Sequence, residues 1–224
     1  MHKEDWAGGG PPGEDSSEYM TGLIEVLAYV REEHLSKMQQ HGAAAAAAAV
    51  GGEGGRGGAR GGARGGGGGG AGASAAAAAA AAVPSARAAA ALGARCLEFF
   101  VRHVSLIRTL GEMGKLRLTK DMAELEHAVG AHLTPASTLG APYRALRALR
   151  SFLFLPADQV VGSPQLQDLP RAQVLHLLYA HAPKALATPW QRAGLAPAQY
   201  SVWLDKHTEA WPGKMFLATS SNTL

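Results

Sequence analysis

The chain has 224 residues, of which 74 are Ala or Gly, so its apolar fraction of 47% overstates the side chains that can build a core. Within 42–91, 40 of 50 residues are Ala or Gly. Such a segment has few large side chains to bury, so burial cannot offset the entropy lost on ordering it. The composition therefore excludes a single 224-residue globule and predicts an N-terminal piece, an insertion and a C-terminal piece long enough for one modest core.

The formal net charge of +3 comes from the insertion, where Arg56, Arg60, Arg64 and Arg87 oppose Glu53. A basic protein normally suggests a nucleic-acid partner. Here the remainder of the chain has balanced charge, so the predicted ordered part has no net charge to attract nucleic acid.

The single cysteine, Cys96, excludes a disulfide within the chain. Residues 1–15 lack the apolar centre of a secretory signal, and no stretch of about 20 strongly apolar residues could span a membrane. We therefore expect a soluble protein that is at most peripheral to a membrane.

Apolar residues at spacings of three and four predict six helices and no strand. Ser16 and Ser17 are candidate N-caps of the first helix, and Gly42 is a candidate stop. The poly-Ala run 75–82 has high helix propensity and is able to extend the second helix. We expect an all-α, antiparallel helical bundle or stack of helical pairs, with helices over 17–40, 86–110, 116–133, 136–154, 170–181 and 197–207.

The predicted organisation has five parts. Residues 1–17 form a disordered N-terminus and 18–41 the first helix of the bundle. A disordered, low-complexity Ala/Gly-rich insertion covers 42–87, the helical bundle domain covers 88–208, and 209–224 form an atypical, disordered tail. In the fourth helix, Arg144, Arg147 and Arg150 alternate with apolar residues, so we expect them to face solvent or partner acids.

A Gly-Lys pair lies within 109–116, but the pattern differs from a phosphate-binding loop. Thr109 stands where that loop has its first Gly, Leu116 stands where it has Ser or Thr, and a predicted helix precedes it. We interpret Gly111 and Gly114 as turn residues between two helices.

The histidines give no convincing metal or catalytic set. The pairs 127/132 and 176/181 are five residues apart, whereas ligands on one helix face need three or four. Cys96 and His103 could share a face but lack a third ligand and an orienting acid. We assign no catalytic, cofactor-binding or metal-binding residue, and we expect no enzymatic activity and no cofactor.

Two further features have alternative interpretations. The Arg-Gly segment 51–70 resembles segments that bind single-stranded RNA, but it has three Arg and no aromatic residue, so compositional drift explains it better. Trp190, Tyr200, Trp203 and Trp211 could anchor a partner, but they more often complete a small core.

Several collinear phrases of the chain stand out, and none is a catalytic signature. They are YMTGL (19–23), FVRHVSLIRTLGEMGKLRL (100–118), DMAELEHAVG (121–130), LG, YR, LR and FLFL within 139–155, AP (182–183), TPWQRAG (188–194) and YSVWLDKH (200–207). Together they resemble the C-terminal region of subunit 5 of the conserved oligomeric Golgi complex. The resemblance covers about 19–41 and 88–208.

The resemblance implies a non-enzymatic, helical subunit of a vesicle-tethering complex on the cytosolic face of the Golgi, acting in retrograde intra-Golgi transport. Implied partners are the other subunits of that complex and membrane-fusion machinery, with peripheral membrane association and no nucleic acid. An RNA-associated protein acting through 51–70 is the alternative.

The chain also departs from the family. Thr109 replaces a Pro, the insertion replaces a modest connection, and the tail after Trp211 does not resemble the helices that close the family's domain. The family's large N-terminal part has no counterpart, which suggests a fragment or a gene model that ends in the wrong frame.

Overall fold

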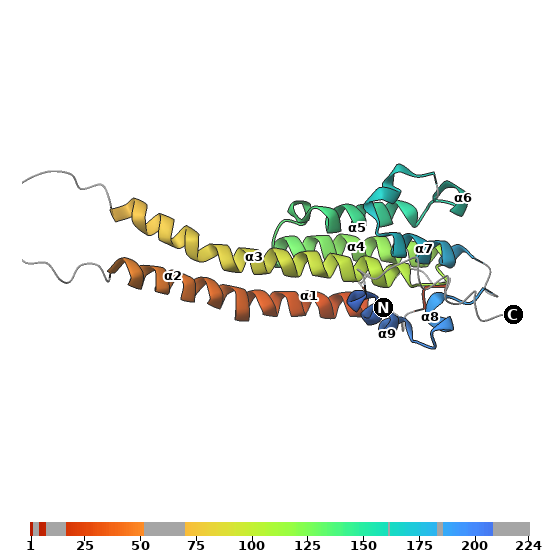
Figure 1. Cartoon of the computed structure of the whole chain (residues 1–224), viewed down its shortest axis with the longest axis horizontal. Coiled ribbons are helices and arrows are strands. Elements are labelled where there is room, and N and C mark those ends of the chain that lie inside the picture. Colours follow the sequence, from red (N-terminus) through yellow and green to blue (C-terminus); the bar gives the residue numbers. More distant parts are fainter. Residues whose placement is uncertain (2–4, 8–16, 52–69, 161, 183–185, 208–224) are drawn as a thin grey trace, which may run out of the picture.

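The computed structural model describes residues 1, 5–7, 17–51, 70–160, 162–182 and 186–207, and all regular secondary structure in these ranges is helical. The predicted all-α class is confirmed. A long two-helix arm projects from a body of shorter helices (Figure 1).

One side of the arm is a continuous helical rod made of α1 (Glu18–Val30), a π-helical turn (Arg31–Leu35) and α2 (Ser36–Gly51). The other side is α3 (Gly70–Ser105), which runs back beside it (Figure 1). Both helices reach into the range expected as the insertion because Ala has the highest helix propensity. The predicted extension through the poly-Ala run is confirmed, and the centre of the insertion, 52–69, lies outside the described residues.

In the body, α4 (Glu112–His132) lies against α1, and α5 (Ala141–Phe152) packs on α3. The expected helix 136–154 is divided into a 3-10 turn (Ala136–Leu139) and α5. Gly140 separates them with φ +63°, a conformation that glycine adopts without strain. As expected, Arg144 meets Asp168 at 3.1 Å and Arg150 meets Glu126 at 3.2 Å.

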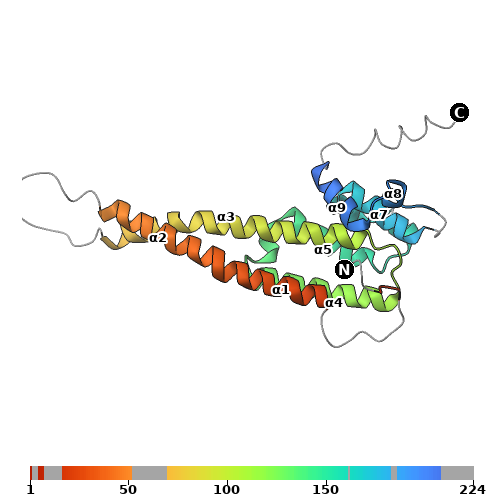
Figure 2. The same ribbon diagram turned by 90° about the horizontal axis from the view of Figure 1, so that it is seen from below.

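The C-terminal part of the body starts with α6 (Ala157–Val160) and a 3-10 turn (Pro164–Asp168). It continues with α7 (Arg171–His181), α8 (Pro189–Arg192) and α9 (Pro197–Lys206). Figure 2 shows α7, α8 and α9 on the side of α3 opposite α1. The long helix α3 therefore has packing partners on both sides, and α7 and α9 both contact it.

Two clusters of buried side chains hold the body together. The larger joins α1, α3, α4 and α5. The smaller surrounds Leu106, Trp190, Tyr200 and Leu204, with Trp203 partly buried against it. The interpretation of these aromatic residues as core is thus confirmed for three of them, and Trp211 lies outside the described residues.

Trp6 lies in the segment expected to be disordered, yet its side chain is only 4% exposed. Its indole packs edge-on against Tyr19, and Arg117 lies 5.6 Å from the centre of its ring. Burial of so large an apolar side chain stabilises an otherwise polar segment. The composition of 1–17 did not reveal this contact, because the residues that bury Trp6 lie in other parts of the chain.

Candidate interaction surface

The junction between α3 and α9 joins two of the phrases that carry the family resemblance. The Arg102 guanidinium, on a side chain 9% exposed, donates to the Ser201 carbonyl at 3.3 Å and to Asp205 at 2.9 Å. On the next residue, the His103 Nε2 lies 3.1 Å from the Ser201 hydroxyl. Residues about a hundred positions apart therefore form one polar contact.

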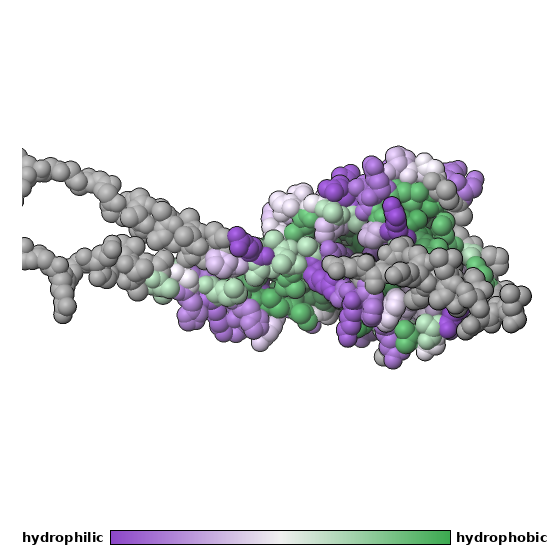
Figure 3. Space-filling model, viewed as in Figure 1, coloured by the Kyte–Doolittle hydropathy of each residue, from purple (hydrophilic) through white to green (hydrophobic). Residues whose placement is uncertain are grey.

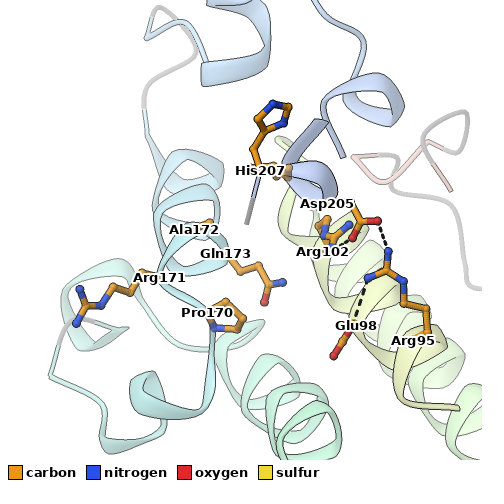
Figure 4. Close-up of a pocket in the computed structure, with 10 residues that line it drawn as sticks. Arg95, Glu98, Arg102, Pro170, Arg171, Ala172, Gln173, Asp205 and His207 are labelled. Atoms are coloured by element: carbon orange, nitrogen blue, oxygen red, sulfur yellow. Dashed lines mark hydrogen bonds and ion pairs between the residues drawn. The ribbon is translucent and has the colours of Figure 1, made fainter. Parts of the chain in front are cut away.

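Asp205 also accepts a hydrogen bond from Arg95, which lies about two turns before Arg102 on α3. The hydrogen bonds from Arg95 and Arg102, with the charges of both guanidinium groups, lower the pKa of the Asp205 carboxyl. Figure 4 shows this carboxylate between the two arginines. The two ion pairs attach α9 to α3.

Phe99 forms an aromatic platform beside this junction. Arg95 lies 4.4 Å and Arg102 5.1 Å from the centre of its ring, and His103 stacks on it at 6.0 Å. Cation–π contacts of this kind restrict the side chains on both sides. The platform is therefore a preorganised, half-buried surface.

Two hollows meet at Arg95, which lines both. The first, of about 560 Å³, opens between α3, α7 and α9 and is shown in Figure 4. Its wall is mixed in charge, because the acids Glu98 and Asp205 line it together with Arg95, Arg102 and Arg171. The ion pairs already satisfy Asp205, and Figure 4 shows the Arg171 side chain turned away from α3.

The second, which we name the α1–α3 hollow, has a volume of about 520 Å³ and is mainly apolar. Tyr19 and Leu23 of α1 form one wall, Leu92, Cys96 and Phe99 of α3 form the other, and Met1 also lines the hollow. Its basic side chains are Arg95 and His103, and no carboxylate among the described residues lines it. Figure 3 shows hydrophobic surface gathered where the arm joins the body.

His176 of α7 is fully buried between Trp190 and Tyr200. Its Nε2 lies 3.4 Å from the Tyr200 hydroxyl, whereas its Nδ1 is buried without a hydrogen-bond partner. Burial lowers the pKa of His176 to about 4 and raises that of Tyr200 to about 12, so both are neutral at pH 7. A neutral, enclosed imidazole fits a core role.

The interpretation of Gly111 and Gly114 as turn residues between two helices holds for Gly111 only, because Gly114 and Lys115 lie within the first turn of α4. Gly111 is the N-cap of α4, and its N–H donates to the Trp6 carbonyl at 2.9 Å. A Cβ on Gly114 would lie 2.3 Å from that carbonyl oxygen, so the glycine permits a close crossing of the backbone. Lys115 pairs with Glu112 at 2.6 Å.

The other candidate residues do not come together as a reaction centre. Cys96 and His103 line the same hollow, but burial raises the pKa of the Cys96 thiol, opposite to the activation of a nucleophile. His127 is exposed, and His176 is enclosed. Within the described residues, no group of three or more His, Cys, Asp or Glu could hold a metal ion.

Other expectations concern the insertion and the membrane. Arg56, Arg60 and Arg64 lie outside the described residues, and Arg87 is exposed on α3. Across the described part of the chain, no helix combines the length and the apolar character needed to cross a bilayer.

The fold and this surface define an elongated, all-helical module. Its most prominent features are the contacts between helices and the two hollows, of which the α1–α3 hollow is mainly apolar.

Comparison with known proteins shows similarity to conserved oligomeric Golgi complex subunit 5. The Arabidopsis thaliana protein is 51% identical over 129 residues, which are 57% of this chain and 16% of that protein. The Mus musculus protein is 44% identical over 118 residues (52% and 14%), and the Drosophila melanogaster protein is 33% identical over 119 residues (52% and 16%). The resemblance to this subunit is confirmed over about half of the chain, which spans about a sixth of the length of these relatives.

No family model matches the chain, and no solved structure matches it. The sequence phrases located the resemblance, but they did not reveal which of their residues touch. One local signal was missed: Thr188 and Gln191 form a capping box at the start of α8, in a stretch expected to be a loop.

Proposed function

We propose that the chain serves as a helical, non-enzymatic part of a Golgi vesicle-tethering complex. The observation that carries this proposal is the 51% identity to the Arabidopsis subunit. It is supported by the α3–α9 junction, where Arg102 and His103 of one family-like phrase contact Ser201 and Asp205 of another. Substitution at either side would disturb the other, as expected for phrases that maintain one fold.

The mechanism of such a part is binding without bond chemistry. Rigid helices span distance, and exposed faces dock other subunits of the complex or membrane-fusion machinery. The arm formed by α1, α2 and α3 provides length, and the body provides side-chain surfaces (Figure 1). Peripheral association with the cytosolic face of the Golgi and action in retrograde intra-Golgi transport complete the proposal.

The test is co-purification of the full chain, carrying an affinity tag, from cells that naturally produce it. Other subunits of the oligomeric Golgi complex should be enriched at least tenfold over a tag-only control. A tagged Asp205→Ala chain should recover less of them, because loss of both ion pairs loosens α9. If no subunit of the complex is enriched with the natural chain, the proposal is wrong.

Retrograde transport needs its own measurement. Depletion of the protein should delay the return of Golgi-resident glycosylation enzymes from later to earlier compartments, and re-expression of the full chain should restore it. Normal recycling after complete depletion would contradict the transport part of the proposal while leaving membership of the complex intact.

A further inference from the structure

We propose that the α1–α3 hollow is a docking site for an amphipathic helix of a partner protein whose apolar stripe is flanked by acidic residues. This proposal deepens the proposed function by naming the surface that binds a partner. It rests on the proposed function for the question of which protein binds there in the cell. The hollow of about 520 Å³ lies within the range of about 300–1,000 Å³ that is typical of ligand pockets.

The first argument is the shape of the site. Its walls belong to α1 and α3, which diverge toward the body (Figure 2), and Met1 also lines it. A groove between two diverging helices accepts a third helix, which inserts apolar residues spaced three and four apart. Leu23 on one wall and Leu92 on the other are each partly buried and leave apolar surface for such a contact.

The second argument is the chemistry of the rim. Arg95 and His103 supply the basic groups that line the hollow, and the described residues place no carboxylate there. Arg95 also contacts Glu98 at 3.5 Å and Asp205, but these acids line the neighbouring cavity. A partner with carboxylates beside its apolar stripe complements this rim, whereas one with lysines at the same positions does not.

The third argument is preorganisation. Phe99 is held by Arg95 and Arg102 above its ring and by the stacked His103, so its position is fixed before a partner arrives. Rigid aromatic side chains lose little entropy on binding and are common anchors of interfaces. Phe99 therefore offers a fixed aromatic contact on the apolar wall, next to the basic residues Arg95 and His103.

Cys96 provides a reporter for the test, since it lines the hollow and is the sole cysteine of the chain. The rate of its alkylation by N-ethylmaleimide is measured on the purified full chain, at constant pH. Two synthetic 18-residue peptides serve as probes, with Leu at the a and d heptad positions and either Glu or Lys at the flanking positions. The Glu peptide should slow alkylation at least tenfold at saturation, and the Lys peptide less than twofold.

Two matched pairs of variants locate the binding. Leu23→Glu should weaken binding of the Glu peptide at least tenfold, whereas Val26→Glu, three residues along α1 and 57% exposed, should not. On the other wall, Leu92→Glu should act like Leu23→Glu, with exposed Ala91→Glu as its control. Far-UV circular dichroism checks that each variant is folded. If the variant on one wall unfolds, the variant on the other wall still tests the proposal.

Several outcomes would overturn the proposal. One is that the two peptides protect Cys96 from alkylation equally, and another is that neither peptide protects it. Two more are that protection of Cys96 rises with the concentration of the chain alone, and that alkylation increases when residues 208–224 are removed. The last two would assign the hollow to a second copy or to the chain's own C-terminal segment. Because purified chain and peptides are used, failure here leaves the co-purification test of the proposed function unaffected.

Discussion

Asp121, in the middle of α4, and Ser17, directly before α1, meet in the interior of the protein. The Asp121 carboxylate accepts one hydrogen bond from the Ser17 hydroxyl at 2.7 Å and another from the Ser17 backbone N–H at 3.2 Å. The Tyr19 hydroxyl donates to the same carboxylate. Asp121 is fully buried and Ser17 is 1% exposed, so this contact sets where the first helix begins relative to α4.

Replacing Asp121 should therefore destabilise the protein. Asp121→Asn keeps the volume but replaces one acceptor oxygen with a donor, so buried donors of Ser17 or Tyr19 lose their partner. An unsatisfied buried group costs about 1–3 kcal/mol. Urea unfolding should show a loss of that size, and Glu112→Gln, on the exposed first turn of the same helix, should change stability by less than about 0.5 kcal/mol.

A double-mutant cycle separates this contact from a general effect of the substitution. If Asp121 acts through Ser17, the combined loss in Ser17→Ala/Asp121→Asn should be smaller than the sum of the single losses by at least about 0.5 kcal/mol. Strict additivity would show that the two residues contribute independently.

Much of this architecture is visible in the sequence because it is local. The helical periodicity gave the positions of α4, α7 and α9 to within a few residues, and it indicated that Arg144 and Arg150 would face solvent or acids. It gave the start of the first helix but not its end, because the helical rod continues through Gly42, the predicted stop, to Gly51. The sequence also placed a helix boundary at Gly111, but it wrongly placed Gly114 in the turn, since Gly114 lies within α4. These features depend on residues close in the chain or on a repeated apolar spacing.

Contacts between distant residues were not predictable in the same way. Trp6 is buried by α1 and α4, and Asp121 is satisfied by residues more than a hundred positions earlier. Neither fact follows from the composition near either residue. The α3–α9 junction was predicted only in part: the sequence identified the phrases that contain Arg102 and Asp205, but it did not predict that these residues contact each other.

Two glycines of α4 should respond in opposite ways to substitution by alanine. In Gly114→Ala the new Cβ would lie 2.3 Å from the Trp6 carbonyl oxygen, which forces a shift worth about 1–3 kcal/mol of stability. In Gly130→Ala the Cβ meets nothing within 4 Å, so higher helix propensity should add about 0.5–1 kcal/mol. Urea midpoints compare both variants with the natural chain, and loss of stability in both would contradict the explanation.

Asp205→Asn should loosen α9. It removes the carboxylate that pairs with Arg95 and Arg102. We expect a loss of about 1–3 kcal/mol, mainly through Arg102, because Arg95 is 40% exposed and its ion pair is screened by water. Amide hydrogen exchange should rise in α9 more than in α4. Asp158→Asn, on the exposed surface of α6, is the control and should leave exchange in α9 unchanged.

The same ion pairs predict a dependence on pH. Hydrogen bonds from the two arginines lower the folded-state pKa of Asp205, so its contribution to stability is complete above its unfolded pKa of about 3.9. That contribution is lost as pH falls through the lower, folded-state pKa. The stability difference between the natural chain and Asp205→Asn should therefore be constant from pH 5 to 7 and shrink in more acidic solution. A difference that grows on acidification would have the wrong sign.

His176 should produce a second, separate loss of stability in acid. Burial lowers its folded-state pKa to about 4, whereas an unfolded histidine has a pKa of about 6.5. Between these values the unfolded chain binds the proton more readily, so the free energy of unfolding falls as pH drops from about 6.5 to about 4. The shift corresponds to a change on the order of 3 kcal/mol across that window.

A variant without the imidazole should lack this slope, even if it is less stable throughout. In His176→Gln the side chain stays polar, as suits a position where Nε2 lies 3.4 Å from the Tyr200 hydroxyl in the natural chain, but it does not titrate. Unfolding by urea at half-unit steps from pH 4 to 7 measures both curves. His127→Gln, on the exposed face of α4, should retain the natural slope because that histidine is not buried. If His176→Gln shows the same fall as the natural chain, the acid-sensitive group is another residue.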